Sequence, residues 1–125
     1  MRWLLDTHVY LWYLADSAQL SAKARRLIAG GDEVFVSAAS IWEAAIKVAS
    51  GKLEVDLTAM VEGIAVSGFI ELPVLARHAA AVSTLPPHHR DPFDRLLVAQ
   101  ALQEPLRLLT CDPMLASYQA VVEVI

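Results

Sequence analysis

Short apolar runs alternate along the chain with longer segments in which apolar positions recur at helical spacing. The runs are continuous rather than interrupted at every second position, which is typical of strands buried on both faces of a parallel sheet. The predicted strands cover residues 3–5, 34–36, 69–72, 106–110 and 121–125.

The segments between these runs predict helices, and several carry terminal signals. Ser21 is a candidate N-cap, and Gly30-Gly31 ends the helix that it opens. Asp91 followed by Pro92 is a strong helix start. The predicted helices cover 9–14, 22–29, 39–50, 57–66, 75–84, 92–103 and a segment after residue 112. We therefore predict an α/β fold of three layers, a mostly parallel sheet flanked by helices.

The composition fits one folded unit. With 125 residues, the chain has a common domain size, so we expect residues 1–125 to form a single domain. Hydrophobic residues make up 56% and charged residues 19%, which excludes disorder and indicates apolar surface for a partner or a second copy. The net charge is -4. Proteins that hold nucleic acid by bulk charge are usually basic, so nucleic-acid chemistry here needs another source of positive charge.

The chain lacks signals for export or membrane insertion. Asp6 and His8 interrupt the first apolar run, and no window approaches the roughly 18 apolar residues of a membrane span. Cys111 is the only cysteine, which leaves no internal disulfide and no zinc–thiolate cage. We expect a soluble, unprocessed, cytoplasmic protein without a membrane partner.

Acidic residues recur where predicted strands end and helices begin. Asp6 closes the first strand, Asp112 follows the fourth, and Glu43 lies early in the helix after the second. Asp91 and Asp94 open the helix before the fourth strand. These positions share one edge of a parallel sheet, so we expect the carboxylates to converge there. Clustered carboxylates need a positive partner to stay ionised, and Mg²⁺ or Mn²⁺ would also activate a water for attack on a phosphate.

Most of these acids also have a structural interpretation. Asp91 and Asp112 each precede a proline and could simply cap a helix, while Asp94 suits the helix dipole. The segment Ser40–Glu43 matches a capping box, with Lys47 one turn on as an ion-pair partner. Asp6 has no evident helix cap to make. No single acid is decisive, but the acids together favour a metal site.

The other candidates for chemistry are weaker. The histidines lack zinc-ligand spacing and are expected to be solvated loop residues, namely His8, His78, His88 and His89. The tryptophans are expected in the core rather than as base-stacking platforms, namely Trp3, Trp12 and Trp42. Arg90 and Arg95 could contact a substrate phosphate or pair with Asp91 or Asp94. Cys111 has no evident base, so a catalytic thiol is not expected.

Four segments together resemble a known family. In order along the chain they are Leu4–His8, Val36–Glu43, Asp91–Ala101 and Leu108–Asp112. They resemble the motifs of PIN-domain nucleases, in particular the VapC-type toxins of bacterial toxin–antitoxin pairs. Each segment alone is a weak signal, but four in the family's order are specific. The sequence departs at Cys111, where a larger or basic residue often precedes the last acid.

The resemblance implies a metal-dependent endoribonuclease that uses Mg²⁺ or Mn²⁺. The catalytic and metal-binding acids that it implies are Asp6, Glu43, Asp94 and Asp112, with Asp91 as a further nearby acid. The residues that it implies as hydrogen-bonding supports for the carboxylates are Thr7, Ser40 and Thr110. Its implied partners are RNA, a second copy of the chain in a homodimer, and a cognate antitoxin that blocks the site.

Two other classes of function remain open from the sequence. A non-catalytic binding module could share the PIN fold without its chemistry. A phosphoacceptor receiver domain has similar length and an acidic pocket, but it needs an acid pair after the first strand, where Asp6-Thr7-His8 offers one acid.

Overall fold

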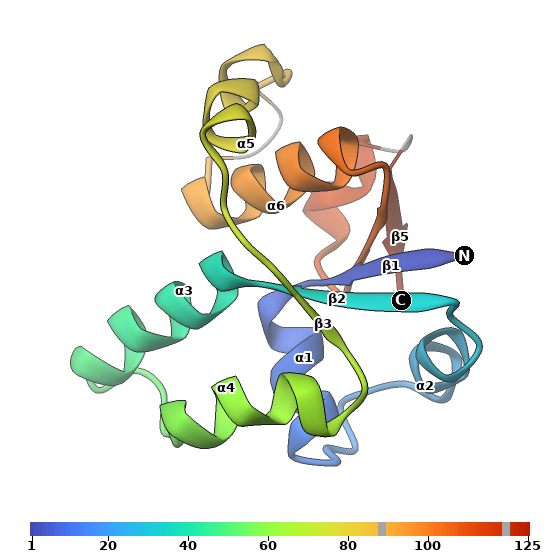
Figure 1. Ribbon diagram of the computed structural model, residues 1–125, viewed down its shortest axis with the longest axis vertical. Coiled ribbons are helices and arrows are strands. Elements are labelled where there is room, and N and C mark those ends of the chain that lie inside the picture. Colours follow the sequence, from blue (N-terminus) through green and yellow to red (C-terminus); the bar gives the residue numbers. More distant parts are fainter. Residues whose placement is uncertain (88–89, 119–120) are drawn as a thin grey trace.

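The computed structural model describes residues 1–87, 90–118 and 121–125. Its strands are β1 (Arg2–Leu5), β2 (Glu33–Ser37), β3 (Ile70–Leu72), β4 (Arg107–Thr110) and β5 (Val122–Val124). All neighbouring strands pair in parallel, in the order β3-β2-β1-β4-β5, so the first strand lies at the centre of the sheet (Figure 1).

Helices connect the strands and cover both faces of the sheet. The α-helices are α1 (Thr7–Leu14), α2 (Ala22–Ala29), α3 (Ala38–Ala49), α4 (Leu57–Val66), α5 (Ala76–Ala81) and α6 (Pro92–Gln103). The 3₁₀ helices are η1 (Val82–Thr84) and η2 (Pro113–Tyr118). In Figure 1, α1, α2 and α4 lie below the sheet, and α5 and α6 lie above it.

Successive strand residues pack on opposite sides of the sheet. Leu5 and Val36 join side chains of α1 to α4 in one core, whereas Leu4 and Phe35 join α6, η1 and η2 in the other. Burial on both faces explains why the strands read as continuous apolar runs. The predicted three-layer α/β fold with a parallel sheet is confirmed.

Some predicted boundaries differ from the structure for local reasons. The first helix begins at Thr7 rather than at residue 9, because the chain turns at Asp6 and the Tyr10 amide bonds the Asp6 carbonyl at 3.0 Å. The predicted helix at 75–84 is α5 followed by η1, and the segment after Asp112 is the 3₁₀ helix η2. Short terminal segments commonly take this tighter form.

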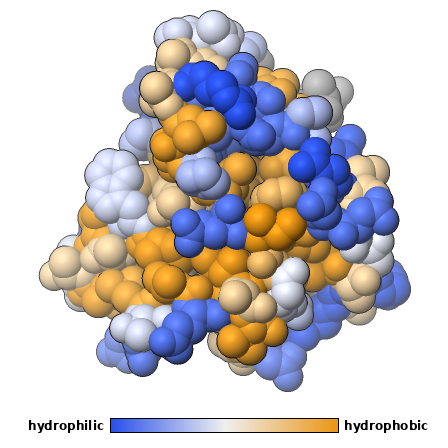
Figure 2. Space-filling view, viewed as in Figure 1, coloured by the Kyte–Doolittle hydropathy of each residue, from blue (hydrophilic) through white to orange (hydrophobic). Residues whose placement is uncertain are grey.

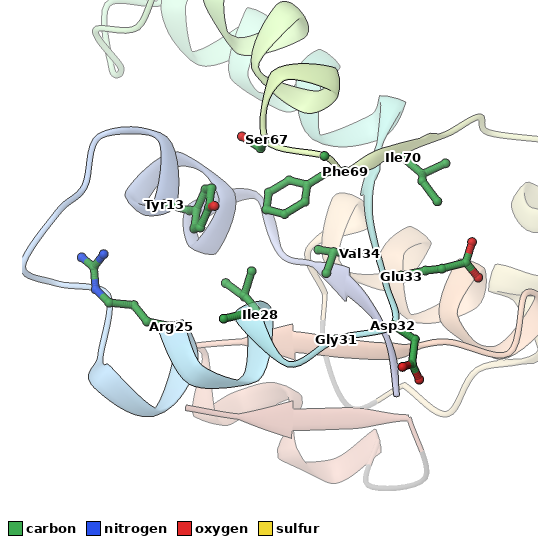
Figure 3. A pocket seen from close by; sticks show the side chains of 12 residues that line it. Tyr13, Arg25, Ile28, Gly31, Asp32, Glu33, Val34, Ser67, Phe69 and Ile70 are labelled. Atoms are coloured by element: carbon green, nitrogen blue, oxygen red, sulfur yellow. The ribbon is translucent and has the colours of Figure 1, made fainter.

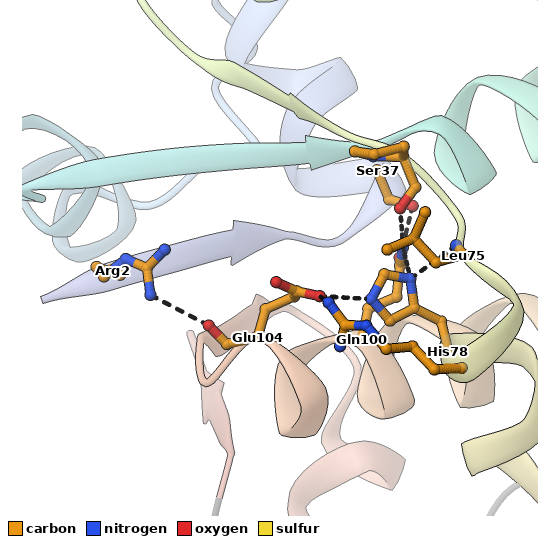
Figure 4. Close-up of polar contacts among 8 residues, drawn as sticks. Arg2, Ser37, Leu75, His78, Gln100 and Glu104 are labelled. Carbon is orange, nitrogen blue, oxygen red and sulfur yellow. Dashed lines mark hydrogen bonds and ion pairs between the residues drawn. The ribbon is translucent and has the colours of Figure 1, made fainter.

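Ser37, His78, Gln100 and Glu104 form a hydrogen-bonded chain that we call the internal network (Figure 4). Ser37 Oγ, at the end of β2, donates to Gln100 Oε1 of α6 at 2.6 Å. Gln100 Nε2 donates to the Pro73 carbonyl at 3.2 Å. The network therefore fastens α6 both to the sheet and to the segment that leads into α5.

His78 is a buried helical residue, so its prediction as a solvated loop residue is wrong. The Leu75 amide donates to His78 Nδ1 at 3.0 Å, which leaves the ring proton on Nε2. Nε2 then donates to Glu104 Oε2 at 2.6 Å, and Arg77 pairs with the same carboxylate. These bonds lower the pKa of Glu104, the His78 bond being the largest cause.

The face formed by α3, α4 and β3 carries exposed apolar side chains (Figure 2). The large ones on these elements are Trp42, Ile46, Val61, Val66 and Ile70, each at least 40% exposed. Among the described residues, no helix combines the length and apolar character that crossing a membrane requires.

Candidate active site

The carboxyl ends of β1, β2 and β4 meet at one edge of the sheet, with β1 between its two neighbours. This is the place where a parallel sheet leaves a crevice for ligands. Asp6 follows β1, Glu43 lies on α3 after β2, and Asp112 follows β4. We call this region, together with Asp91 and Asp94 at the start of α6, the acidic edge.

Asp6 is held in place by the strands on which the site is built. Its amide donates to the Leu109 carbonyl at 3.0 Å, and its Oδ2 accepts from Thr110 Oγ1 at 2.6 Å. Its side chain makes no capping bond to α1 although it occupies the N-cap position. Burial raises the pKa of Asp6, while hydrogen bonds from Thr110 and the Thr7 backbone oppose this. The Glu43 charge adds to the rise, so these two carboxylates interact.

Glu43 lies inside α3 rather than at its start, and the predicted capping box is wrong. The N-cap is Ser37, whose Oγ accepts from the Ala39 amide at 3.0 Å. Ser40 is free to face α1 instead, where its Oγ accepts from Thr7 Oγ1 at 2.9 Å. This buried bond ties the helix that carries Glu43 to the helix that begins beside Asp6.

The Glu43 carboxylate is only half satisfied by the described residues. Oε2 pairs with Lys47 Nζ at 3.1 Å, as the sequence predicts. Oε1 is buried and has no hydrogen-bond partner among the described residues. A buried oxygen of this kind costs about 1–3 kcal/mol unless a group outside the chain completes it.

Asp91 and Asp94 both occupy the start of α6, where their contacts differ. Asp91 is the N-cap, with Oδ1 accepting from the amides of Phe93 at 2.9 Å and Asp94 at 3.1 Å. The structure thus shows the helix-capping role that the Asp-Pro pair predicts. Asp94 lies in the first turn, half-buried.

Asp112 also has a structural bond, because its Oδ1 accepts from the Met114 amide at 2.9 Å at the start of η2. Its own amide donates to Thr110 Oγ1 at 3.1 Å, the hydroxyl that bonds Asp6. Cys111 lies between these residues. Burial raises the pKa of its thiol, and the charges of Asp6, Asp112 and Asp94 raise it further. The charges of three of the predicted acids therefore act on one half-buried thiol.

The acids share an electrostatic environment without closing into a cage. No three His, Cys, Asp or Glu side chains in the described ranges come close enough together to enclose a metal ion by themselves. The structure thus brings Asp6 and Glu43 into the buried part of the edge and places Asp91, Asp94 and Asp112 around it, half-buried.

The two candidate phosphate-binding arginines differ. Arg90 is exposed and forms no ion pair with a described residue. Arg95 donates to the carbonyls of Val82 at 3.1 Å and Pro86 at 3.2 Å, and so supports the segment before α6. His88 and His89 lie outside the described residues. His8 is exposed as predicted, but it lies on α1, so its prediction as a loop residue is wrong.

The tryptophans also differ from one another. Trp3 is 3% exposed and belongs to the core, as predicted, and Trp12 is half-buried against that core. Trp42 is 61% exposed, so its prediction as a core residue is wrong. Its ring meets that of Phe93 edge to face, with centroids 5.1 Å apart. Trp42 thus places an exposed aromatic ring one residue before Glu43, which its apolar character in the sequence does not reveal.

A separate cavity of about 320 Å³ lies away from the acidic edge. Figure 3 shows Tyr13, Ile28, Val34 and Phe69 lining it. It opens beside Glu33, where β2 begins, so it lies at the opposite edge of the sheet. Arg25 on its wall pairs with Asp16. We assign it no part in the site.

Comparisons with known proteins support one family. The family model for the PIN domain matches residues 3–121. The chain is 33% identical over 122 residues to Ribonuclease VapC22 of Mycobacterium tuberculosis, covering 93% of this chain and 91% of that protein.

Solved structures show the same fold at low sequence identity. The structure of VapBC2 from Rickettsia felis, bound to a promoter DNA fragment, has a chain with a TM-score of 0.72 and 14% identity, covering 99% of this chain and 98% of that one. FitAcB from Neisseria gonorrhoeae has a TM-score of 0.66 and 19% identity, covering 98% and 96%.

Proposed function

This chain is a VapC-type member of the PIN domain family, and on that premise we propose that it is a metal-dependent endoribonuclease, the toxin of a toxin–antitoxin pair. The mycobacterial relative is named a ribonuclease, and one structural relative is a VapBC assembly on promoter DNA. By analogy, we propose RNA as the substrate, a cognate antitoxin as a partner, and a homodimer as the assembly. The exposed apolar side chains Val61 and Val66 of α4 and Ile70 of β3 offer area for such protein partners.

The observation that carries the proposal is the incomplete Glu43 carboxylate beside Asp6. Both residues are 5% exposed, Glu43 Oε1 has no partner among the described residues, and burial raises the pKa of Asp6. Each of these unfavourable features is relieved by a cation at the acidic edge. We therefore propose that the edge binds a cation.

The donor set fits Mg²⁺ or Mn²⁺. The proposed ligands are carboxylates, namely Asp6, Glu43, Asp94 and Asp112, with Asp91 nearby. Their open arrangement suits Mg²⁺, which keeps several waters and usually takes only one or two carboxylates. When bound, the ion supplies Lewis-acid activation of water and offsets negative charge developing on the phosphate.

The chain's own residues would position this chemistry. Thr110 Oγ1 fixes the Asp6 carboxylate by its 2.6 Å bond, and the bond between Thr7 and Ser40 fixes α3 against α1. We propose that Arg90, which is exposed beside Asp91, contacts a substrate phosphate. Arg95 could contact a phosphate in the same way only while it also donates hydrogen bonds to the carbonyls of Val82 and Pro86.

Cleavage of total cellular RNA by the purified protein tests the proposal, with Mg²⁺, with Mn²⁺ and with EDTA. The site variant is Asp94→Asn. The matched control is Asp16→Asn, whose side chain is 87% exposed and whose positive φ of 49° is one that asparagine tolerates. We expect metal-dependent cleavage in the wild type and the control, and its loss in Asp94→Asn.

Equal cleavage by all three proteins would point to a contaminating nuclease and contradict the proposal. Absence of cleavage, together with growth that is unaffected when the wild type is expressed, would favour a non-catalytic binding module with the PIN fold. Calorimetry with Mg²⁺ separates these cases, because metal binding that is lost in Asp94→Asn supports the site independently of any RNA.

A further inference from the structure

Trp42 is exposed at a position where exposure has no folding benefit. Complete burial of a large apolar side chain stabilises a fold by about 1.5–3 kcal/mol, yet 61% of Trp42 remains accessible. Its neighbour Ala44 is fully buried on the other side of α3, so the helix is oriented by other residues. Trp42 therefore contributes little to the core that holds α3.

The surroundings of Trp42 place it at the acidic edge. It directly precedes Glu43, and the ring that it contacts, Phe93, directly precedes Asp94. The two rings meet at 71° with centroids 5.1 Å apart, which bridges α3 and α6 across the site. Phe93 is half-buried and steadies the indole, while the exposed fraction of Trp42 leaves indole surface open to solvent.

We propose that Trp42 binds an unpaired base of the RNA substrate by stacking, next to the phosphodiester at the acidic edge, with Phe93 holding the indole in position. The inference rests on the proposed function and adds a substrate-positioning residue to it. Stacking on an aromatic ring binds bases without requiring positive charge, which suits a chain of net charge -4. A base can stack in this way only when it is free of its own duplex, so the residue favours single-stranded segments.

The experiment measures RNA binding in the Asp94→Asn background with Mg²⁺ present, so that cleavage does not intervene. The probes are a labelled 12-nucleotide RNA of mixed sequence without self-complementarity, and the same RNA annealed to its complement. Trp42→Ala, Trp42→Phe and Ile46→Ala are compared by fluorescence anisotropy across a salt series. Ile46 is the matched control, because it lies one turn along α3 and is 45% exposed.

We expect Trp42→Ala to weaken binding of the single strand by about 5- to 150-fold, with Trp42→Phe losing much less. Binding of the duplex should change little, and the slope of log affinity against log salt should be unchanged, because no charge is removed. Ile46→Ala should bind both probes like its parent. Quenching of tryptophan fluorescence by the single strand should disappear in Trp42→Phe.

Three results would overturn the inference. One is no measurable binding of the single strand by the parent protein, and another is equal weakening for both probes. The third is a comparable loss in Ile46→Ala together with a shift to a smaller species in sedimentation, which would make this surface an interface between protein copies. Trp42-dependent binding by a protein whose wild type cleaves no RNA would support the inference while the proposed nuclease activity fails.

Discussion

In the internal network, every buried side-chain polar atom of Ser37, His78 and Gln100 has a hydrogen-bond partner. At the acidic edge, Glu43 Oε1 has none among the described residues, and burial raises the pKa of Asp6. The two regions are close in the fold, since Ser37 caps the helix that carries Glu43. The same chain therefore completes one polar cluster and leaves the other incomplete.

This difference separates a structural polar cluster from a functional one. A satisfied network stabilises the fold and fixes its elements, because each bond would be lost on unfolding. An incomplete cluster destabilises the protein in the absence of a ligand, and binding of a group that completes the cluster restores the lost stability. The experiments below test this distinction, beginning with the largest expected effect.

Asp6→Asn should reduce metal-dependent RNA cleavage by about 1,000-fold. Lewis-acid stabilisation is worth several kcal/mol, and each 1.4 kcal/mol changes a rate about tenfold. The fold should survive, because an amide can still bond the Thr110 hydroxyl and the Thr7 backbone. Initial cleavage rates and circular dichroism measure the two effects. Unchanged cleavage would remove Asp6 from the site.

Gln100→Ala should lower the free energy of unfolding by about 3 kcal/mol. It deprives the Ser37 hydroxyl and the Pro73 carbonyl of their partners, each worth about 1–3 kcal/mol when buried. Urea denaturation measures the change. Gln103→Ala, an exposed position on the same helix, should change it by less than about 0.5 kcal/mol. A Gln100→Ala protein as stable as the wild type would mean that the internal network does not stabilise the fold.

Mg²⁺ should stabilise the wild type and the Gln100→Ala protein alike. At a free concentration about 100 times Kd, the free energy of unfolding should rise by about 2.7 kcal/mol. In Asp94→Asn the rise should shrink or vanish, since a ligand is lost at the acidic edge. Denaturation with and without Mg²⁺ gives the comparison. An equal rise in Asp94→Asn would place the ion elsewhere.

In EDTA, lowering the pH should change the stability that the two regions contribute in opposite directions. These changes in the free energy of unfolding should be the smallest of those predicted here. The raised pKa of Asp6 gives a stability that is fully present below its unfolded value of 3.8 and lost as pH rises through the folded pKa. The lowered pKa of Glu104 gives a stability that is present above 4.5 and lost as pH falls through the folded pKa. At neutral pH, Asp6→Asn should therefore have a higher free energy of unfolding than the wild type, whereas Glu104→Gln should have a lower one. Urea midpoints from pH 3 to pH 8 would show parallel curves if neither pKa is shifted.

Much of the fold and part of the site follow from local patterns in the sequence. Continuous apolar runs predict the parallel sheet because both of its faces are covered. Asp6 stands out because an acid at the end of a buried strand has no evident helix cap to make. The Lys47 partner of Glu43 is also predicted, since it lies one helical turn away.

The errors arise where a residue's environment is set by distant segments. Ser37 and Ser40 both precede helical sequence, and it is the end of β2 at Ser37 that decides which of them caps α3. The sequence predicts His78 to be solvated because its partners are distant in the chain: Gln100 lies on α6 and Glu104 is the C-cap of that helix. The exposure of Trp42 likewise depends on which elements pack beside α3, which its own sequence does not reveal.

The two strands that pair with β1 lie far apart in the chain, so they are also synthesised at different times. Translation adds about 5–20 residues per second, so roughly a hundred residues between Asp6 and Asp112 take about 5–20 s to make. During that interval β1 can pair with β2, while β4 and Asp112 have not yet been made. A nascent chain without β4 therefore lacks Asp112 and the Thr110 hydroxyl that bonds Asp6. The proposed toxin would therefore begin to cleave RNA only after β4 and Asp112 have been made and β4 has paired with β1.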